Sequence, residues 1–184
     1  MLNKDLNILI IGLGLLGGSY AKSLSRQGYK VNAITRDPNT IKYALEHNMI
    51  SYGTVEIDKT LIENADLIVF ALYPKVFIKW IEENGRLIKK GTVITDVTGV
   101  KGAVVDKVQS MLPEGVEFIS AHPMAGRESS GIEYADDTIF KSANYIVVPT
   151  EKNSPEAITI CRELGQTLGF AKVSELSVEA HDRM

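Results

Sequence analysis

The sequence predicts an α/β fold, a doubly wound and mostly parallel sheet with helices on both faces. The unbroken apolar run Ile8–Ile11 and the segment Asp66–Leu72, which is apolar after its first residue, have the composition of strands that are buried on both faces. Each run is followed by a turn and then a segment with helical periodicity, as expected for parallel strands joined by crossover helices. The length of 184 residues suits one domain, or one domain with the start of another.

The first apolar run leads directly into a Gly-x-Gly-x-x-Gly motif made by Gly12, Gly14 and Gly17. In such motifs the first glycine permits the tight turn, the second lets backbone approach a pyrophosphate, and the third lets the helix pack close to the strand. The helix N-terminus offers unpaired N–H groups and the positive end of its dipole to phosphates. The motif predicts a Rossmann-type dinucleotide site that also includes Leu15 and Leu16; the alternative is a glycine-rich turn with no ligand.

The end of the second expected strand, Tyr29–Thr35, bears on the choice between NAD and NADP. An acidic residue there binds the ribose hydroxyls of NAD and repels a 2′-phosphate, whereas a nearby arginine attracts that phosphate. If the strand ends at Thr35, Arg36 can pair with the 2′-phosphate of NADP. If the register lies two residues later, Asp37 favours NAD. Both side chains can instead cap the next helix. We expect NADP, with NAD as the alternative.

Two later strands are also expected to end at the ligand site. Ligands of open parallel sheets bind beyond the carboxyl ends of the strands, so the segment Leu72-Tyr73-Pro74 is expected to line the cofactor. The strand Gly91–Asp96 is followed by Thr98 and Lys101, which together with Asp96 place a carboxylate, a hydroxyl and an amine at one strand end. This set indicates a functional loop, although Thr98 could simply cap the following helix.

A histidine stands at the end of the next expected strand, Glu117–Ala121. His122 is followed by a proline and two nearby glycines, and it lies where catalytic groups lie in doubly wound folds. Imidazole titrates near neutrality, so it can accept a proton from a hydroxyl group as a hydride leaves. The alternative is a histidine that only hydrogen-bonds its own loop.

The remaining chain is expected to form a strand over Ala143–Pro149, a helix over about 155–168, a short strand to Val173, and the opening of one more helix from Glu175. No glycine, proline or polar tail closes that last helix. We therefore expect residues 1–173 to form the dinucleotide-binding domain, and residues 174–184 to begin a helix that leads to an absent C-terminal helical domain.

Composition favours a soluble cytoplasmic protein. The net charge of −3 without a basic stripe gives no reason to expect nucleic acid as a partner. No apolar run is long enough to span a membrane, and the first strand begins too early to leave room for a signal peptide. The single cysteine, Cys161, cannot form an internal disulfide, which suits a reducing compartment. No pattern of metal ligands is present, so no metal is expected.

Four motifs together resemble the prephenate dehydrogenase family, which includes arogenate dehydrogenases. They are the segments Gly12–Ser19, Thr95–Lys101, His122–Gly131 and Glu179–Asp182. The resemblance spans essentially the whole chain, and the His-Pro-x-Ala-Gly-x-Glu-x-Ser-Gly segment is its most specific part.

The resemblance implies NAD(P)-dependent oxidative decarboxylation of prephenate to 4-hydroxyphenylpyruvate, in tyrosine biosynthesis. It implies that His122 accepts the proton of the substrate hydroxyl, that His181, Glu128 and Ser130 belong to the substrate site, and that Asp96 and Lys101 lie beside the nicotinamide. Many members carry a serine at the position of Gly99, so Thr98 is expected to take over that hydroxyl's role. The family's helical domain forms the dimer, so a homodimer is expected only with that domain, and this chain alone is expected to be weakly active or inactive.

Three other functions stay open from the residues alone. Arogenate dehydrogenase differs only in the side chain of its substrate. A dehydrogenase for hydroxy acids or imines would place a catalytic lysine in a following domain, and its histidine segment would differ. A dinucleotide-binding sensor without chemistry would need no base at His122.

Overall fold

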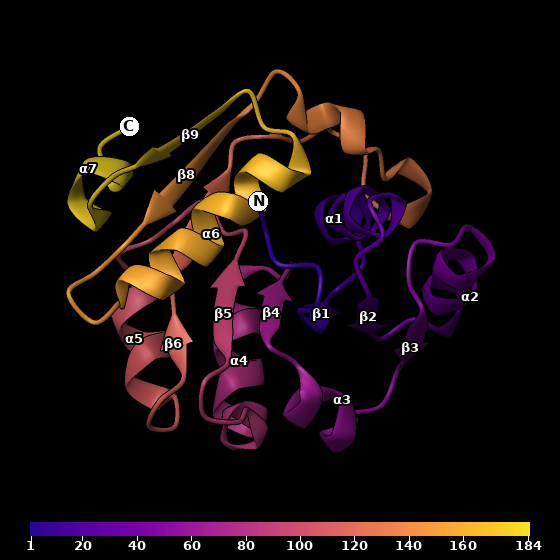
Figure 1. Cartoon of the computed structure of the whole chain (residues 1–184), viewed down its shortest axis with the longest axis horizontal. Coiled ribbons are helices and arrows are strands. Elements are labelled where there is room, and N and C mark those ends of the chain that lie inside the picture. Colours follow the sequence, from indigo (N-terminus) through magenta and orange to yellow (C-terminus); the bar gives the residue numbers. More distant parts are fainter.

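The computed structural model describes all 184 residues and contains two sheets. The larger sheet has six parallel strands in the order β3-β2-β1-β4-β5-β6 (Figure 1). Its strands are β1 (Ile8–Ile11), β2 (Val31–Ile34), β3 (Tyr52–Thr54), β4 (Leu67–Phe70), β5 (Val93–Asp96) and β6 (Glu117–Phe118). Strand order reverses between β1 and β4, which is the point where doubly wound sheets bind ligands. The predicted fold class is confirmed.

Helices cover both faces of this sheet. They are α1 (Leu15–Arg26), α2 (Pro38–Glu46), α3 (Lys59–Asn64), α4 (Pro74–Asn84), α5 (Val105–Met111) and α6 (Pro155–Leu168). A seventh helix, α7 (Val178–Asp182), lies to one side and contacts the loop after β5. Alternate residues of β1 enter two separate cores: Ile8 and Ile10 pack with residues of α1 and α6, whereas Leu9 and Ile11 pack with residues of α4. Burial on both faces explains why β1 and β4 are continuously apolar in sequence.

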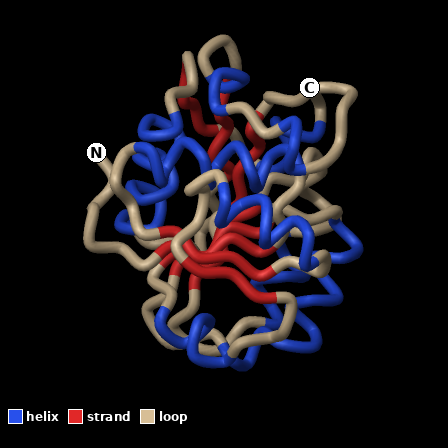
Figure 2. The backbone as a smooth tube through the Cα atoms, turned by 90° about the vertical axis from the view of Figure 1, so that its right-hand side faces the viewer, coloured by secondary structure: helices blue, strands red, loops and turns tan.

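A second sheet of three strands was not expected. It contains β7 (Ser120–Pro123), β8 (Asn144–Val148) and β9 (Lys172–Glu175), with β7 antiparallel and β9 parallel to β8. Figure 2 shows its strands as a group apart from the stacked strands of the larger sheet. The chain passes from β6 to β7 through Ile119 alone, so the single strand expected over Glu117–Ala121 is two strands in different sheets. β6 is the edge of the larger sheet, and pairing with β8 gives the next residues the backbone partners that this edge lacks.

This second sheet changes two sequence-based boundaries. His122 lies within β7, opposite Ile146 of β8, instead of directly after a strand. The strand expected to end at Val173 continues as β9 to Glu175, and the Leu176 amide still donates to Val147. The last helix therefore begins at Val178 and not near Glu175, with the Ser177 hydroxyl accepting the Ala180 amide as its cap. None of the helices combines the length and the apolar character that crossing a bilayer requires.

Candidate active site at the carboxyl edge of the sheet

Two glycines close the turn between β1 and α1. Gly12 has a φ of +93°, and a Cβ there would lie 2.6 Å from the Ala71 carbonyl oxygen. A Cβ at Gly17 would lie 2.0 Å from the Gly12 carbonyl oxygen, so only glycine allows the helix to approach the strand this closely. At Gly14, by contrast, nothing lies within 4 Å of the Cβ position. The open side of the turn therefore leaves free space directly in front of the helix N-terminus.

That space suits a pyrophosphate. No side chain caps the start of α1, and its first turn contains no acidic residue. The amides of Leu15, Leu16 and Gly17 precede the first intrahelical bond, which the Gly18 amide makes with Gly14. Unpaired amides at the positive end of a helix dipole are a general anion site, so the residues present fit a dinucleotide.

The residues at the end of β2 take different positions. β2 ends at Ile34, and the Asp37 carboxylate accepts the Asn39 amide at 2.9 Å as the N-cap of α2. Arg36 is exposed and forms neither a hydrogen bond nor an ion pair. Thr35 still donates its amide to Thr54 of the neighbouring strand. Asp37 therefore makes the contact that the capping alternative expects, while the Arg36 guanidinium makes no contact of its own.

The end of β4 lies beside the glycine turn. A Cβ at Gly12 would lie 2.9 Å from a methyl carbon of Leu72, so this side chain packs against the turn. Tyr73, the next residue, is 82% exposed, and Pro74 is the first residue of α4. The structure thus brings the expected strand-end segment next to the predicted dinucleotide site.

A buried ion pair lies behind this edge. Asp96 and Lys101 have no exposed side-chain surface, and Lys101 Nζ lies 3.2 Å from Asp96 Oδ2. The carboxylate also accepts bonds from the Ser120 hydroxyl at 2.6 Å and the Ala121 amide at 3.0 Å. Lys101 Nζ donates to the Ala121 carbonyl at 2.7 Å. Burial lowers the pKa of Lys101, an effect that the adjacent Asp96 carboxylate opposes.

The enclosure of these two side chains does not fit the expectation that Asp96 and Lys101 bind the cofactor. Both side chains are fully enclosed and already hydrogen-bonded, so neither presents an atom to a ligand. Their bonds instead tie the loop after β5 to the start of β7, which carries His122. The ion pair therefore fixes the position of the strand that carries His122 without contacting a ligand.

Thr98 belongs to the same buried cluster. Its hydroxyl donates to Asp96 and lies 3.1 Å from the Val100 carbonyl oxygen, and its amide also donates to Asp96. The hydroxyl is therefore engaged away from His122. The expectation that Thr98 takes over the role of the serine hydroxyl does not fit these contacts, since the position that faces the imidazole is Gly99. A Cβ at Gly99 would lie 3.5 Å from Nε2 of His122.

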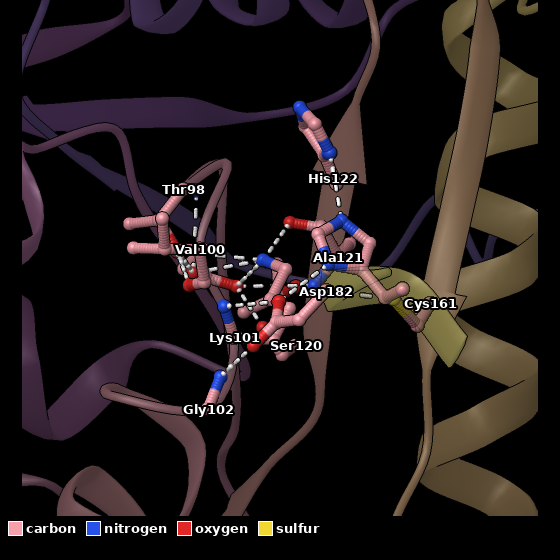
Figure 3. Close-up of polar contacts among 12 residues, drawn as sticks. Thr98, Val100, Lys101, Gly102, Ser120, Ala121, His122, Cys161 and Asp182 are labelled. Atoms are coloured by element: carbon pink, nitrogen blue, oxygen red, sulfur yellow. Dashed lines mark hydrogen bonds and ion pairs between the residues drawn. The ribbon is translucent and has the colours of Figure 1, made fainter. Parts of the chain in front are cut away.

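Two histidines and an aspartate are joined by hydrogen bonds. Figure 3 labels His122 and Asp182, the two ends of this series. Nδ1 of His122 lies 2.8 Å from Nε2 of His181, and Nδ1 of His181 lies 2.9 Å from the Asp182 carboxylate. That carboxylate also accepts the amides of Lys101 at 3.1 Å and Gly102 at 2.7 Å. His181 is only 4% exposed, whereas His122 is half-buried and its Nε2 has no hydrogen-bond partner.

The burial of His122 and the positive charges near it favour the neutral form of its ring. Partial burial lowers its pKa, and the nearby Lys101 and His181 lower it further. The hydrogen bond from His181 and the Gly102 amide lower the pKa of Asp182. A neutral imidazole can act as a proton acceptor at neutral pH.

His181 has contacts other than those expected of a substrate ligand. Both of its ring nitrogens are engaged within the protein, and its side chain is buried. Glu128 and Ser130 are exposed, and neither forms a hydrogen bond with His122 or His181. Their loop is anchored by an ion pair of 2.6 Å between Arg127 and Asp136. Hydrogen bonds from Thr138 hold the pKa of Asp136 at about 2.

Two functional positions were missed from the sequence. Asp182 ends the Glu179–Asp182 motif, but no role was predicted for its carboxylate. Its place directly after His181 was the only available signal. Ser120 had no signal, because its bond with Asp96 exists only through the switch from β6 to β7.

Comparison with known proteins agrees with this geometry. A family profile described as the nucleotide-binding domain of prephenate dehydrogenase matches residues 20–174. The chain belongs to the prephenate dehydrogenase family. It is 31% identical to the prephenate dehydrogenase of Bacillus subtilis over 183 residues, which covers 97% of this chain and 48% of that protein. The chain therefore spans about half the length of the curated relatives it matches.

Solved structures of the family have the same fold. The prephenate dehydrogenase of Aquifex aeolicus, in complex with hydroxyphenyl propionate and NAD+, is 28% identical with a TM-score of 0.87, and the match covers 98% of this chain and 63% of that one. Synechocystis arogenate dehydrogenase is also 28% identical, with a TM-score of 0.88 and coverage of 97% and 62%.

Proposed function

We propose that this chain is the nucleotide-binding and catalytic part of an NAD(P)-dependent prephenate dehydrogenase. The observation that carries the proposal is the state of His122, whose Nδ1 is held by His181 while Nε2 remains free beside the open position at Gly99. The family membership and the Aquifex complex with a hydroxyphenyl ligand and NAD+ support the same substrate class and cofactor class.

The reaction is the oxidative decarboxylation of prephenate to 4-hydroxyphenylpyruvate. When bound, the oxidised nicotinamide accepts the hydride from the carbon that carries the substrate hydroxyl. Nε2 of His122 accepts the hydroxyl proton as the hydride leaves, carbon dioxide departs from the ring, and the proton returns to the oxygen as the ring becomes aromatic. A positioned base of this kind contributes about 10²- to 10⁴-fold to the rate.

We also propose that NADP binds more tightly than NAD. The Asp37 carboxylate is turned to the Asn39 amide as the cap of α2, and Arg36 has no competing partner. Loss of a charge-assisted hydrogen bond is worth about 1.5–3 kcal/mol. Replacing Arg36 with alanine is therefore expected to weaken NADPH binding by about 10- to 100-fold and to leave NADH binding nearly unchanged. Equal losses for both cofactors would contradict this assignment.

The relatives' greater length supports two further proposals: that residues 174–184 lead into a helical domain, and that this domain completes the substrate pocket and forms a homodimer. Size determination of the intact protein by light scattering tests the dimer.

The decisive test of function compares wild type with His122→Asn. The intact protein is given prephenate, or arogenate in a parallel assay, and reduced nicotinamide is followed by absorbance. We expect wild-type turnover, its loss by at least about 100-fold in the variant, and unchanged cofactor affinity. Turnover that survives the substitution would refute His122 as the base. Cofactor binding without turnover of either substrate in wild type would favour the dinucleotide sensor.

A further inference from the structure

We infer that Asp182 and His181 are positioning residues that fix the tautomer of His122 and thereby make Nε2 the atom that accepts the proton. This inference deepens the proposed function and rests on it for its catalytic meaning. The hydrogen-bonded chain itself is a property of the folded protein and can be tested without substrate.

The donor and acceptor of each hydrogen bond between His122, His181 and Asp182 follow from the carboxylate of Asp182. The Asp182 carboxylate can only accept hydrogen bonds, and it already accepts the amides of Lys101 and Gly102. The ring nitrogen of His181 that contacts it must therefore carry a proton. In a neutral imidazole the other nitrogen is then an acceptor, so His181 Nε2 accepts and His122 Nδ1 donates across their 2.8 Å contact. Nε2 of His122 is left with its lone pair free.

The surroundings of Asp182 indicate that this arrangement is built into the fold. Asp182 is the last residue of α7, yet its carboxylate is bound to the loop between β5 and α5, 80 residues earlier in the sequence. A Cβ on Gly102 would lie 2.9 Å from Asp182 Oδ2, so the absence of a side chain there lets the carboxylate reach the backbone amide. One carboxylate thus joins α7 to the loop that carries Gly99, the residue facing His122.

The other charged side chains around His122 do not fix its tautomer. Lys101 and Asp96 act on its pKa in opposite directions, and both are enclosed in the buried cluster without a hydrogen bond to the imidazole. His181 is the one side chain that hydrogen-bonds the ring of His122, with Asp182 behind it. The hydrogen bond that Asp182 makes with His181 is therefore its route to the tautomer of His122.

The first test is nitrogen NMR of the histidine rings in this chain at a pH where both are neutral. A ring nitrogen that carries a proton has a chemical shift distinct from one that does not, so the tautomer of each ring is read directly. We expect His122 and His181 to carry their protons on Nδ1, although free histidine favours Nε2. A proton on Nε2 of His122 in the wild-type protein would overturn the inference.

The second test replaces Asp182 with asparagine. The carboxamide of Asp182→Asn has one acceptor oxygen for the three N–H groups of Lys101, Gly102 and His181 that the carboxylate accepts. Where its NH2 group faces His181 Nδ1, both rings are expected to move their protons to Nε2. The matched control is Glu179→Gln, which removes the same charge from an exposed position on the same helix. It should leave both tautomers as in wild type. Equal effects of the two variants would show a general charge effect and contradict the inference.

The third test connects the tautomer to the reaction. Asp182→Asn should lower kcat by about 10- to 100-fold, the usual effect of removing the partner that orients a functional histidine, while the Kd for NADPH stays within about twofold of wild type. Gly102→Ala displaces the carboxylate without removing a titratable group and should shift the same NMR signals, which keeps the test informative if Asp182→Asn folds poorly. Unchanged kcat with altered tautomers would refute the positioning role. If wild type shows the expected tautomers but turns over no substrate, the proposed function fails and the hydrogen-bonded chain stands.

Discussion

Replacing Lys101 with methionine is expected to destabilise the protein by about 3–5 kcal/mol, because it leaves the Asp96 carboxylate buried without its counter-charge. Both side chains are completely enclosed, and Nζ lies 3.2 Å from Asp96 Oδ2 and 2.7 Å from the Ala121 carbonyl oxygen. Methionine fills a similar volume, so the effect comes from the lost charge and its hydrogen bonds more than from a cavity. A domain of this size loses about 2–4 °C of Tm for each kcal/mol, which gives a decrease of about 6–20 °C.

Lys89→Met provides the matched control. Lys89 forms an ion pair with Asp66 at 3.4 Å, but the two side chains are 42% and 34% exposed. Solvent screens such pairs, so its loss is expected to change stability by less than about 1 kcal/mol. Urea unfolding followed by circular dichroism measures both variants. If Lys101→Met and Lys89→Met differ from wild type by similar small amounts, the reasoning about the buried pair is wrong.

Four other substitutions or conditions test the site. Gly17→Ala should destabilise the fold by about 1–3 kcal/mol or more, since its Cβ would lie 2.0 Å from a backbone oxygen. Gly14→Ala should change stability by only about 1 kcal/mol yet weaken dinucleotide binding at least about tenfold, and urea unfolding together with nicotinamide fluorescence separates the two effects. The pKa of His122 is lower in the folded protein than in the unfolded chain, so the unfolded chain takes up this proton at a higher pH. The free energy of unfolding should therefore decrease as pH falls below about 6.5. The value of kcat/KM should also decrease with falling pH, with a midpoint below about 6.5. Gly99→Ser should place a hydroxyl near Nε2 of His122, and a bond to the neutral ring should lower its NMR titration midpoint by up to about one unit; an unchanged midpoint would contradict the placement of Gly99.

The larger sheet was predictable because local sequence determines it. Burial on both faces requires apolar runs such as Ile8–Ile11, and the turn that follows requires glycine at positions 12 and 17. These signals lie within single segments, so no knowledge of distant contacts was needed. The fold class follows from them, and they also predict a dinucleotide site at the turn after the first strand.

The arrangement of the candidate site depended on contacts between distant segments. The passage from β6 to β7 at Ile119 has no local signal, since either sheet can pair an apolar segment. The enclosure of Lys101 follows from that passage, because β7 brings the Ala121 carbonyl to the amine. The position of Asp182 depends on α7 packing against the loop after β5. Sequence therefore predicted His122 as a candidate base but could not predict the side chains that hydrogen-bond its partner.

The central claim is that the glycine turn binds a nicotinamide dinucleotide within reach of a base held at His122. The most direct measurement is a calorimetric titration of the 184-residue chain with NADP and with NAD, repeated for the Gly14→Ala variant. We expect saturable binding of both cofactors to wild type, tighter binding of NADP, and a marked loss of affinity in the variant. Failure of either cofactor to bind the folded wild-type chain would contradict the account.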